Sequence, residues 1–329
     1  MIIAVMHWRK HPSKVSRMYP LAAICKLEGV DFYYFTPRHV NFENKTVRGY
    51  HYDDGWKKKT FPFPDIVLNS SRLRTTKQIE VRRRLKNYVL FSESKIGSKK
   101  AVDSILKKSY YKKNLPETIK VRSRYELYNF IDKYKRVVLK PSVGARGESI
   151  YFIVKENTEY KIFYQQEVFT DLDGFLDSID LDLYLAQRYI DSKTKMNLPV
   201  DYRIHTQKDG NGNYVITKIY PRVAPKAFTV TNISQGSYSV YIKPFLRQNF
   251  ENADEIYTKL KVLGIGVSKY LDNHYHNLNE LGLDVCIEDG IPYIIEVNWR
   301  PGSIIQFFSS YEHLVNLVRY SIYKVKNNQ

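Results

Sequence analysis

The chain is poor in cysteine and lacks long apolar runs. Only two cysteines occur among its 329 residues, Cys25 and Cys286, and each lies in an apolar stretch. This argues against a disulfide framework or a cysteine-based metal site and indicates buried, reduced thiols. The first apolar run, residues 1–6, is too short for a signal peptide, and its positive charges follow it. No run approaches membrane-spanning length, so we expect a soluble, cytoplasmic protein without a membrane span.

The chain also contains few acidic residues relative to basic ones. Asp and Glu number 34 against 52 Lys and Arg, which gives a formal net charge of +18. Such a field attracts anions, among them nucleotides, nucleic acid and acidic polymers, without choosing between them. The short basic runs, such as residues 56–59 and 82–84, are equally typical of an ordinary solvated surface. No aromatic and basic motif of a known nucleic-acid module occurs, so a specific nucleic-acid partner ranks last.

The length of the chain predicts two or three compact units. In its first part, apolar strand runs alternate with helical patterns, at residues 2–6, 14–29, 30–35, 65–69 and 76–85. This alternation predicts a small open α/β domain. Within the first helical pattern, Pro20 either kinks the helix or lies in the first turn of a shorter one.

After about residue 92 the pattern changes to hairpins and longer helices. We expect helices at residues 99–108, 123–134, 253–275 and 311–323. We expect paired strands at residues 137–154, 200–223 and 283–298. Hairpins packed against helices indicate an α+β second part of the chain.

A glycine-containing loop follows the strand at residues 137–140. The strand ends in Lys140, and the loop holds Gly144 and Gly147. Glycine lets backbone N–H groups approach phosphate oxygens, and the lysine supplies a point charge. The segment is not a P-loop, because Gly-Lys-Ser/Thr is missing and a strand follows. An ordinary hairpin loop explains the same residues, so both interpretations stay open.

Three oxygen-bearing side chains occur in an otherwise apolar hairpin near the C-terminus. Glu296 and Asn298 are two residues apart on one expected strand, so they share a face, and Asp284 lies on the neighbouring strand. Their convergence is costly without a cation, and hard oxygen ligands suit Mg²⁺. The alternative is a solvated sheet face, which the strongly apolar flanks disfavour.

A third group of charged residues lies on the hairpin at residues 200–223. Asp201, Arg203 and His205 share a face by the period of two, and Arg222 lies on the return strand. Arginine there can clamp a transferring phosphoryl group. A surface ion pair explains Asp201 as well, and we expect no catalytic role for His205.

The hairpin of Asp284, Glu296 and Asn298, which we call the metal hairpin, must also have the right strand register, which is a condition of parity. With regular pairing, its three side chains can share a face only if the loop contains an odd number of residues. With a plain two-residue turn at residues 289–290, Asp284 would oppose Ile295 and point away from Glu296. We therefore expect a three-residue loop, either residues 288–290 or one centred on the glycine, which would set Asp284 opposite Glu296. In either case the three oxygen-bearing side chains would point into one cleft and face the strand-end lysine.

These three segments, in this order and at these spacings, resemble the ATP-grasp superfamily, and within it the YheC/YheD-like group of endospore coat-associated proteins. The resemblance extends over nearly the whole chain and includes Val138-Leu139-Lys140-Pro141, Asp201-Tyr202-Arg203 and Ile295-Glu296-Val297-Asn298. It implies an α/β, Rossmann-like pre-ATP-grasp domain over residues 1–92. It implies a two-lobed α+β ATP-grasp domain over residues 93–329, with the small lobe at about 93–185 and the large lobe at about 186–329.

The resemblance also implies the cofactors, which are ATP and Mg²⁺ with Mn²⁺ as an alternative, and a role for each matching residue. The residues implied in nucleotide binding are Lys99 and Lys140 at the phosphates, Gly144, Arg146 and Gly147 in the covering loop, Gln187, Tyr189 and Ile190 at the hinge beside adenine, and Asp201 at the ribose. The residues implied in catalysis are Arg203 and Arg222. Those implied in metal binding are Asp284, Glu296 and Asn298.

Some positions depart from the pattern of the group. Ser98 stands where an aspartate before the first lysine is usual, the loop has only two glycines, and Trp299-Arg300 replaces a Ser-Lys pair. These changes concern loop closure and the choice of acceptor, and they remove no metal or phosphate ligand.

Three functions compete. The first is an ATP-dependent ligase that activates a carboxylate as an acylphosphate for attack by an amine or similar nucleophile. The second is a spore-associated structural or binding protein with little turnover, and the third is a basic protein that binds polyanions. The residues identify neither the acceptor, which the positive charge suggests is acidic, nor the oligomeric state.

Overall fold

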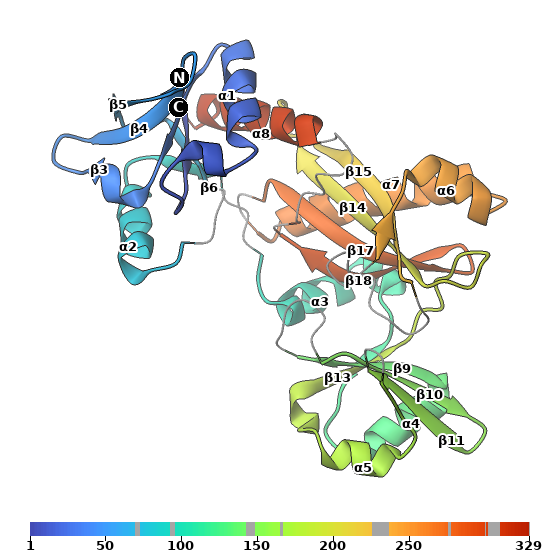
Figure 1. Ribbon diagram of the computed structural model, residues 1–329. Coiled ribbons are helices and arrows are strands. Elements are labelled where there is room, and N and C mark those ends of the chain that lie inside the picture. Colours follow the sequence, from blue (N-terminus) through green and yellow to red (C-terminus); the bar gives the residue numbers. More distant parts are fainter. Residues whose placement is uncertain are drawn as a thin grey trace.

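A computed structural model describes residues 1–69, 73–92, 96–142, 149–164, 167–225, 237–275, 278–299, 301 and 310–328. These residues form three β-sheets, each covered by helices (Figure 1). Short 3-10 helices lie between the larger elements, at Pro12–Lys14, Pro37–His39, Tyr110–Asn114 and Leu181–Leu183. The expected fold class, an α/β domain followed by two α+β lobes, is confirmed.

The N-terminal domain is built on a mixed sheet. Its parallel strands are β1 (Ile2–Met6), β2 (Asp31–Phe35), β6 (Ile66–Asn69) and β7 (Leu90–Ser92). Its antiparallel strands are β3 (Val40–Asn41), β4 (Thr46–Tyr52) and β5 (Trp56–Pro62). The order is β3-β4-β2-β1-β6-β7, and β5 pairs with β4. Parallel strands joined by helices are typical of open α/β domains.

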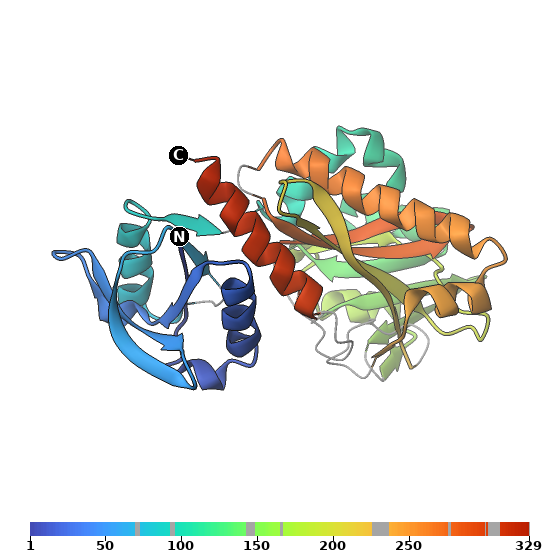
Figure 2. The ribbon, with the colours of Figure 1, turned by 90° about the horizontal axis from the view of Figure 1, so that it is seen from above.

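Three helices cover this sheet: α1 (Met18–Leu27), α2 (Thr76–Leu85) and the C-terminal α8 (Ser310–Lys326). α1 and α8 share one core with the sheet, in which Leu314 and Val318 of α8 pack, and Leu85 of α2 packs in a separate core. Figure 2 shows α8, in red, running between the N-terminal domain and the rest of the protein. The C-terminal helix therefore joins two parts of the fold. Pro20 lies in the first turn of α1, so the shorter helix is the correct alternative.

The small lobe is an antiparallel sheet of order β12-β11-β10-β9-β13-β8. In chain order its strands are β8 (Thr118–Lys120), β9 (Arg136–Pro141), β10 (Tyr151–Glu156), β11 (Glu159–Tyr164), β12 (Glu167–Phe169) and β13 (Tyr184–Arg188). Helices α4 (Arg124–Tyr134) and α5 (Leu172–Asp177) pack on one core with this sheet. β13 continues three residues beyond the proposed lobe boundary at residue 185.

The large lobe holds the antiparallel sheet β16-β15-β14-β17-β18. In chain order its strands are β14 (Val200–Lys208), β15 (Tyr214–Val223), β16 (Tyr238–Ser239), β17 (Glu280–Glu288) and β18 (Ile291–Asn298). Its helices are α3 (Lys99–Lys107), α6 (Ile242–Asn249) and α7 (Ala253–Asp272). α3 falls within the range expected for the small lobe, about residues 93–185, yet Val102 and Leu106 pack in the core of the large lobe.

The two faces of the large-lobe sheet differ in polarity. Alternate residues such as Ile204 and Leu283 are fully buried in the core shared with α7. There α7 approaches closely at Gly264, where a Cβ atom would lie 2.5 Å from Cγ2 of Ile204. The intervening residues, beginning with Asp201 and Arg203, lie on the opposite face by the period of two. We call this opposite side the polar face, and it carries the candidate site.

His7 makes the stability of the fold depend on pH. The residue is 7% exposed, and Nδ1 of its imidazole accepts a hydrogen bond from the backbone N–H of Arg9 over 2.9 Å, which requires the neutral form. Burial, aided by the charges of Arg9 and Arg17, lowers its pKa to about 4. Because the unfolded state binds this proton first, its contribution to stability is present above about pH 6.5 and is lost as the pH falls toward 4.

We expect acidification from pH 7 to pH 4 to cost the wild type about 3 kcal/mol of unfolding free energy more than the His7→Gln variant, whose side chain does not titrate. Urea unfolding at a series of pH values measures this difference. Parallel pH profiles for the two proteins would show that His7 titrates normally in the fold.

Candidate functional site

The polar face holds two buried arginine–aspartate pairs on three neighbouring strands. Asp201 and Arg222 oppose each other on β14 and β15 and form a bidentate pair, in which Nε donates to Oδ1 over 2.7 Å and Nη2 donates to Oδ2. Arg203 and Asp284 oppose each other on β14 and β17 and pair in the same way, with Nη2 donating to Oδ2 over 3.1 Å. Nη2 of Arg222 also lies 3.0 Å from Oδ1 of Asp284, so the four residues form one charge network.

The network is largely shielded from water. Its side chains are between 9% and 12% exposed. Burial opposes the charge of Arg222, but Asp201 and Asp284 raise the pKa of Arg222 above its ordinary value. Arg222 therefore stays charged, and each arginine is held in a fixed orientation by two hydrogen bonds. Since a guanidinium has five N–H donors, each arginine keeps donors for a further anion.

The hairpin of β17 and β18 meets the parity condition in an unexpected way. The three-residue loop that we predicted is wrong. Glu288 pairs with Ile291 across a two-residue turn in which Asp289 and Gly290 have φ values of 51° and 71°, as in a type I′ turn. The register then shifts, because Ile295 is bulged out between two paired residues.

The bulge places the candidate metal ligands together. Asp284 stands directly opposite Glu296, and Asn298 opposes Gly282, so the expected common face of the three side chains is confirmed. Nδ2 of Asn298 donates to Oδ2 of Asp284 over 3.3 Å. At Gly282 a Cβ atom would lie 2.6 Å from Cβ of Pro301 and 3.3 Å from Arg203, so only glycine leaves this space open.

Lys140 and Gln187 lie side by side on the small-lobe sheet. Nζ of Lys140 donates to Oε1 of Gln187 over 3.0 Å, and Nε2 of Gln187 donates to the hydroxyl of Thr118 over 2.9 Å. The hydrogen bonds fix the orientation of the amide and hold the ammonium beside it. Tyr189 and Ile190 follow at the end of β13, where Ile190 is buried and burial raises the pKa of Tyr189. Of the expected hinge residues, Gln187 thus contacts Lys140, whereas Tyr189 lies further along, where its backbone N–H donates to the carbonyl of Arg136.

The last residue of β13 and the segment that follows it make hydrogen bonds with the end of β17 next to the turn. Arg188 pairs with Oε2 of Glu288, and the backbone N–H of Asp191 donates to Oε1 of the same residue over 2.8 Å. The hydroxyl of Ser192 accepts a hydrogen bond from the backbone N–H of Ile287 over 3.0 Å. These contacts connect the two lobes, and the sequence analysis missed them. Arg188 and Glu288 are a hundred residues apart, and no local pattern pairs them.

Part of the expected site cannot be placed. Gly144, Arg146 and Gly147 lie outside the described residues. Lys99 begins α3, and only its backbone is described. The hydroxyl of Ser98 accepts a hydrogen bond from the backbone N–H of Ala101 over 3.2 Å, so this departure from the family pattern supplies the N-cap of α3.

The polar face extends beyond the residues that the sequence analysis selected. Tyr220 opposes Arg203, and Lys218 opposes His205. Burial lowers the pKa of Lys218 to about 8. Counting in steps of two from Arg222 along β15 would have found both residues. The candidate site is therefore one continuous row of polar residues along the polar face, which we call the polar strip, rather than three separate motifs.

No helix within the described ranges has both the length and the apolar character needed to cross a membrane. This agrees with the absence of long apolar runs in the sequence.

Comparisons with known proteins identify the family and the fold of the chain. A family model described as YheC/D like ATP-grasp matches residues 87–324. The chain is 26% identical over 313 residues to the endospore coat-associated protein YheD of Bacillus subtilis (strain 168), with 87% of this chain and 67% of YheD covered. The chain thus spans about two thirds of the length of that relative.

Solved structures resemble the whole chain. The D-alanine–D-alanine ligase from Bacillus anthracis complexed with ATP matches with a TM-score of 0.52 and 15% identity, over 99% of both chains. The ATP-grasp ligase PsnB complexed with minimal precursor, Mg and ADP matches with a TM-score of 0.52 and 11% identity, over 98% of both chains. At these identities the likeness shows the fold alone, and it confirms the fold that the resemblance implied.

Proposed function

Because the chain belongs to the YheC/D-like ATP-grasp family, we propose that it binds ATP with Mg²⁺ and uses them to activate a carboxylate for attack by an amine. One observation carries the proposal: Arg203 and Arg222 converge on Asp284 in the buried network, with Glu296 opposite and Asn298 beside it. Cations that can neutralise phosphate thus lie next to oxygen ligands that suit Mg²⁺.

The residues on the polar face fit a magnesium ion by their chemistry. Asp284 and Glu296 offer carboxylate oxygens and Asn298 offers an amide oxygen, all on one face. These three residues would hold a bound Mg²⁺, which would supply charge neutralisation for the transferring phosphoryl group. The same residues fit Mn²⁺.

The arginines have two tasks in this proposal. Without a nucleotide they neutralise the two aspartates, which lowers the cost of burying the carboxylates. When Asp284 serves as a metal ligand, the remaining N–H donors of Arg203 and Arg222 bind the phosphate oxygens. Because the pairs already hold both guanidinium groups in place, little reorganisation is needed when charge develops.

The small lobe supplies the rest of the nucleotide site. The ammonium group of Lys140 contacts the phosphates, and Gln187, Tyr189 and Ile190 line the adenine side. Asp201 accepts from the ribose or keeps Arg222 in position. Lys99 and the loop of Gly144, Arg146 and Gly147 complete the contacts to phosphate. This assignment follows the family pattern residue by residue, and the contact of Lys140 with Gln187 and the pair of Asp201 with Arg222 support it.

The reaction consists of two displacements. A carboxylate oxygen of the acceptor attacks the γ-phosphorus of ATP, ADP leaves, and an acylphosphate forms. The nitrogen of an amine then attacks the acyl carbon, and inorganic phosphate leaves. The net positive charge of the chain favours an acidic acceptor, because opposite charge raises the rate of encounter.

A second candidate is a spore-associated binding protein with little turnover. Its support is the name of YheD, an endospore coat-associated protein. A third candidate is a polyanion-binding protein, supported by the charge of +18. Such binding would weaken steeply with salt and would not depend on Mg²⁺.

We expect Lys140→Ala to weaken ATP binding about 100-fold in the presence of Mg²⁺, whereas Lys58→Ala leaves it unchanged. Lys140 is partly buried beside Gln187, and Lys58 lies exposed on β5. Losing a charged hydrogen-bond partner of phosphate costs about 3 kcal/mol, and losing an exposed charge costs little. Calorimetry with and without Mg²⁺ measures both variants.

Equal losses in the two lysine variants, or an ATP affinity that is independent of Mg²⁺, would favour the polyanion-binding candidate. An assay of ATP hydrolysis with candidate carboxylates and amines then separates the ligase from the binding protein. Release of phosphate that requires both a carboxylate and an amine supports the ligase.

A further inference from the structure

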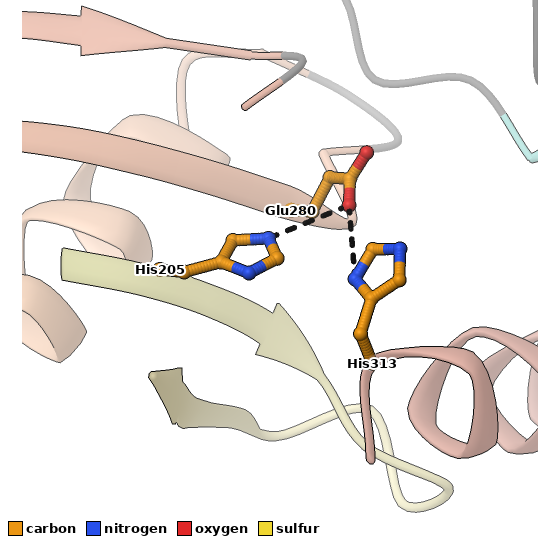
Figure 3. A group of neighbouring side chains, drawn as sticks. All are labelled: His205, Glu280 and His313. Atoms are coloured by element: carbon orange, nitrogen blue, oxygen red, sulfur yellow. Dashed lines mark ion pairs between the residues drawn. The ribbon is translucent and has the colours of Figure 1, made fainter. Parts of the chain in front are cut away.

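The polar strip of the large-lobe sheet ends in a group of two histidines and a glutamate (Figure 3). His205 lies on β14, and Glu280 begins β17 on the same face, because it is two residues before the opposing Gly282. α8 brings His313 to the same point. Nε2 of His205 lies 3.6 Å from Oε2 of Glu280, and Nδ1 of His313 lies 3.8 Å from it.

The two imidazole nitrogens that point at Glu280 are buried. Among the described residues, neither Nε2 of His205 nor Nδ1 of His313 has a hydrogen-bond partner, and His313 is only 8% exposed. Their distances to the carboxylate exceed those of a hydrogen bond. A buried polar atom that makes no hydrogen bond costs about 1–3 kcal/mol. Two such atoms directed at one carboxylate oxygen indicate that a ligand belongs between them.

We propose that His205, Glu280 and His313 bind a divalent transition-metal ion of the Zn²⁺ class. Two imidazole nitrogens and one carboxylate oxygen form the ligand set of many three-residue zinc sites. Ligands at about 2.0–2.1 Å from a tetrahedral ion lie roughly 3.4 Å apart. The distances of 3.6 Å and 3.8 Å are close to this value, and all three ligand atoms lie within 4.8 Å of one another.

The protonation states suit this role. Burial lowers the pKa of His313 to about 4, so its imidazole is neutral at neutral pH and keeps a lone pair for the metal. Burial raises the pKa of Glu280, but His205, His313 and Arg17 more than offset it, so the carboxylate is ionised. The nitrogen-rich ligand set separates this ion from Mg²⁺, which prefers oxygen ligands.

Two positive groups face the cluster. Arg17, which lies directly before α1, interacts electrostatically with Glu280 and His313, and Lys218 stands opposite His205. Both histidine contacts are to Oε2, so the carboxylate retains its second oxygen for other partners. A positive charge so near the cluster repels the metal ion and lowers the affinity of the site for it. Replacing Arg17 with glutamine should therefore tighten metal binding.

The position of the site gives the ion a structural effect. His205 and Glu280 belong to the large-lobe sheet, while His313 belongs to the helix whose Leu314 and Val318 pack in the core of the N-terminal domain. An ion held by all three would fasten α8 to the sheet and join these parts of the molecule. Three protein ligands also leave one coordination position for water or for a group of a bound molecule.

The test is a titration of the full chain with Zn²⁺ and, separately, Co²⁺, without nucleotide and after treatment with a chelator. We expect one ion per chain, a Co²⁺ absorption spectrum typical of nitrogen and oxygen ligands in tetrahedral geometry, and a rise in Tm on adding Zn²⁺. His205→Ala, His313→Ala and Glu280→Gln should each weaken binding at least about 100-fold, because each removes a direct ligand.

His274→Ala is the matched control, since its imidazole lies exposed after α7 and should leave binding unchanged. Circular dichroism of the metal-free variants shows whether each still folds, and a folded variant that fails to bind supports the assignment. The proposal is overturned if the wild type binds no ion tightly, if the three ligand variants bind as the wild type does, or if Arg17→Gln abolishes binding. Calorimetry of the same variants with Mg²⁺ and ATP measures nucleotide binding separately. The failure of the zinc-site proposal can thereby be distinguished from the failure of the proposed function.

Discussion

Asp284→Asn is expected to lower the Mg²⁺-dependent part of ATP affinity about 100-fold and any turnover on the order of 1000-fold. Asp284 contacts both arginines of the network, and it stands opposite Glu296. Asparagine keeps the shape and an acceptor oxygen but removes the charge that a hard cation requires. Isothermal titration with ATP at several Mg²⁺ concentrations measures the effect.

Asp289→Asn is the matched control for this change. Asp289 lies in the turn of the same hairpin at a φ of 51°, a conformation that asparagine tolerates well. The control removes one negative charge from the same element, five residues away, without touching the network. If both variants bind Mg²⁺-ATP alike, a general change of charge explains the result and Asp284 is no metal ligand. Thermal melting of both proteins ensures that the comparison is made on folded chains.

Local signals in the sequence predicted most elements well. The helix expected at residues 76–85 has the bounds of α2, and in the structure the hydroxyl of Thr75 caps it by accepting a hydrogen bond from the backbone N–H of Gln78. The hairpins at residues 200–223 and 283–298 were expected with bounds close to the observed ones. Alternation and turn residues act over a few positions, so a single sequence contains them.

The metal hairpin shows where such reasoning stops. Parity correctly required Asp284 to share a face with Glu296, but it did not predict how the hairpin meets this requirement. The sequence Asp-Gly favours a type I′ turn, and this local preference prevailed over the predicted three-residue loop. The correction came from a bulge at Ile295, whose position depends on packing across the sheet. Parity can require an odd residue, yet it does not say where in the hairpin that residue lies.

Contacts between distant segments were beyond prediction for a different reason. The amphipathic pattern of α8 indicates that one face is buried, but it does not name the partner, which is the core shared with α1. His313 could therefore not be placed beside His205 and Glu280, which are 33 or more residues away in the chain. The association of segments is decided by tertiary packing, and one sequence without relatives carries little information about it.

Arg222→Met is expected to destabilise the nucleotide-free protein by about 3–5 kcal/mol. The side chain of Arg222 is 12% exposed, pairs with both oxygens of Asp201 and lies 3.0 Å from Asp284. Methionine fills a similar volume but leaves a buried carboxylate without its main counter-charge, which is the costly way to break such a pair. Urea unfolding, with the m-value compared to that of the wild type, measures the loss.

The double variant Asp201→Asn with Arg222→Met should recover about half of that loss, because it removes the stranded charge together with its partner. Lys57→Met is the surface control: Lys57 pairs with Asp53 over 2.7 Å, but both side chains are more than half exposed, so its unfolding curve should overlay that of the wild type. A loss in Arg222→Met no larger than in Lys57→Met would mean that the network is not a stabilising unit. A double variant less stable than Arg222→Met alone would mean that Asp201 is held by groups other than this arginine, and the account of prearranged arginines would fail with it.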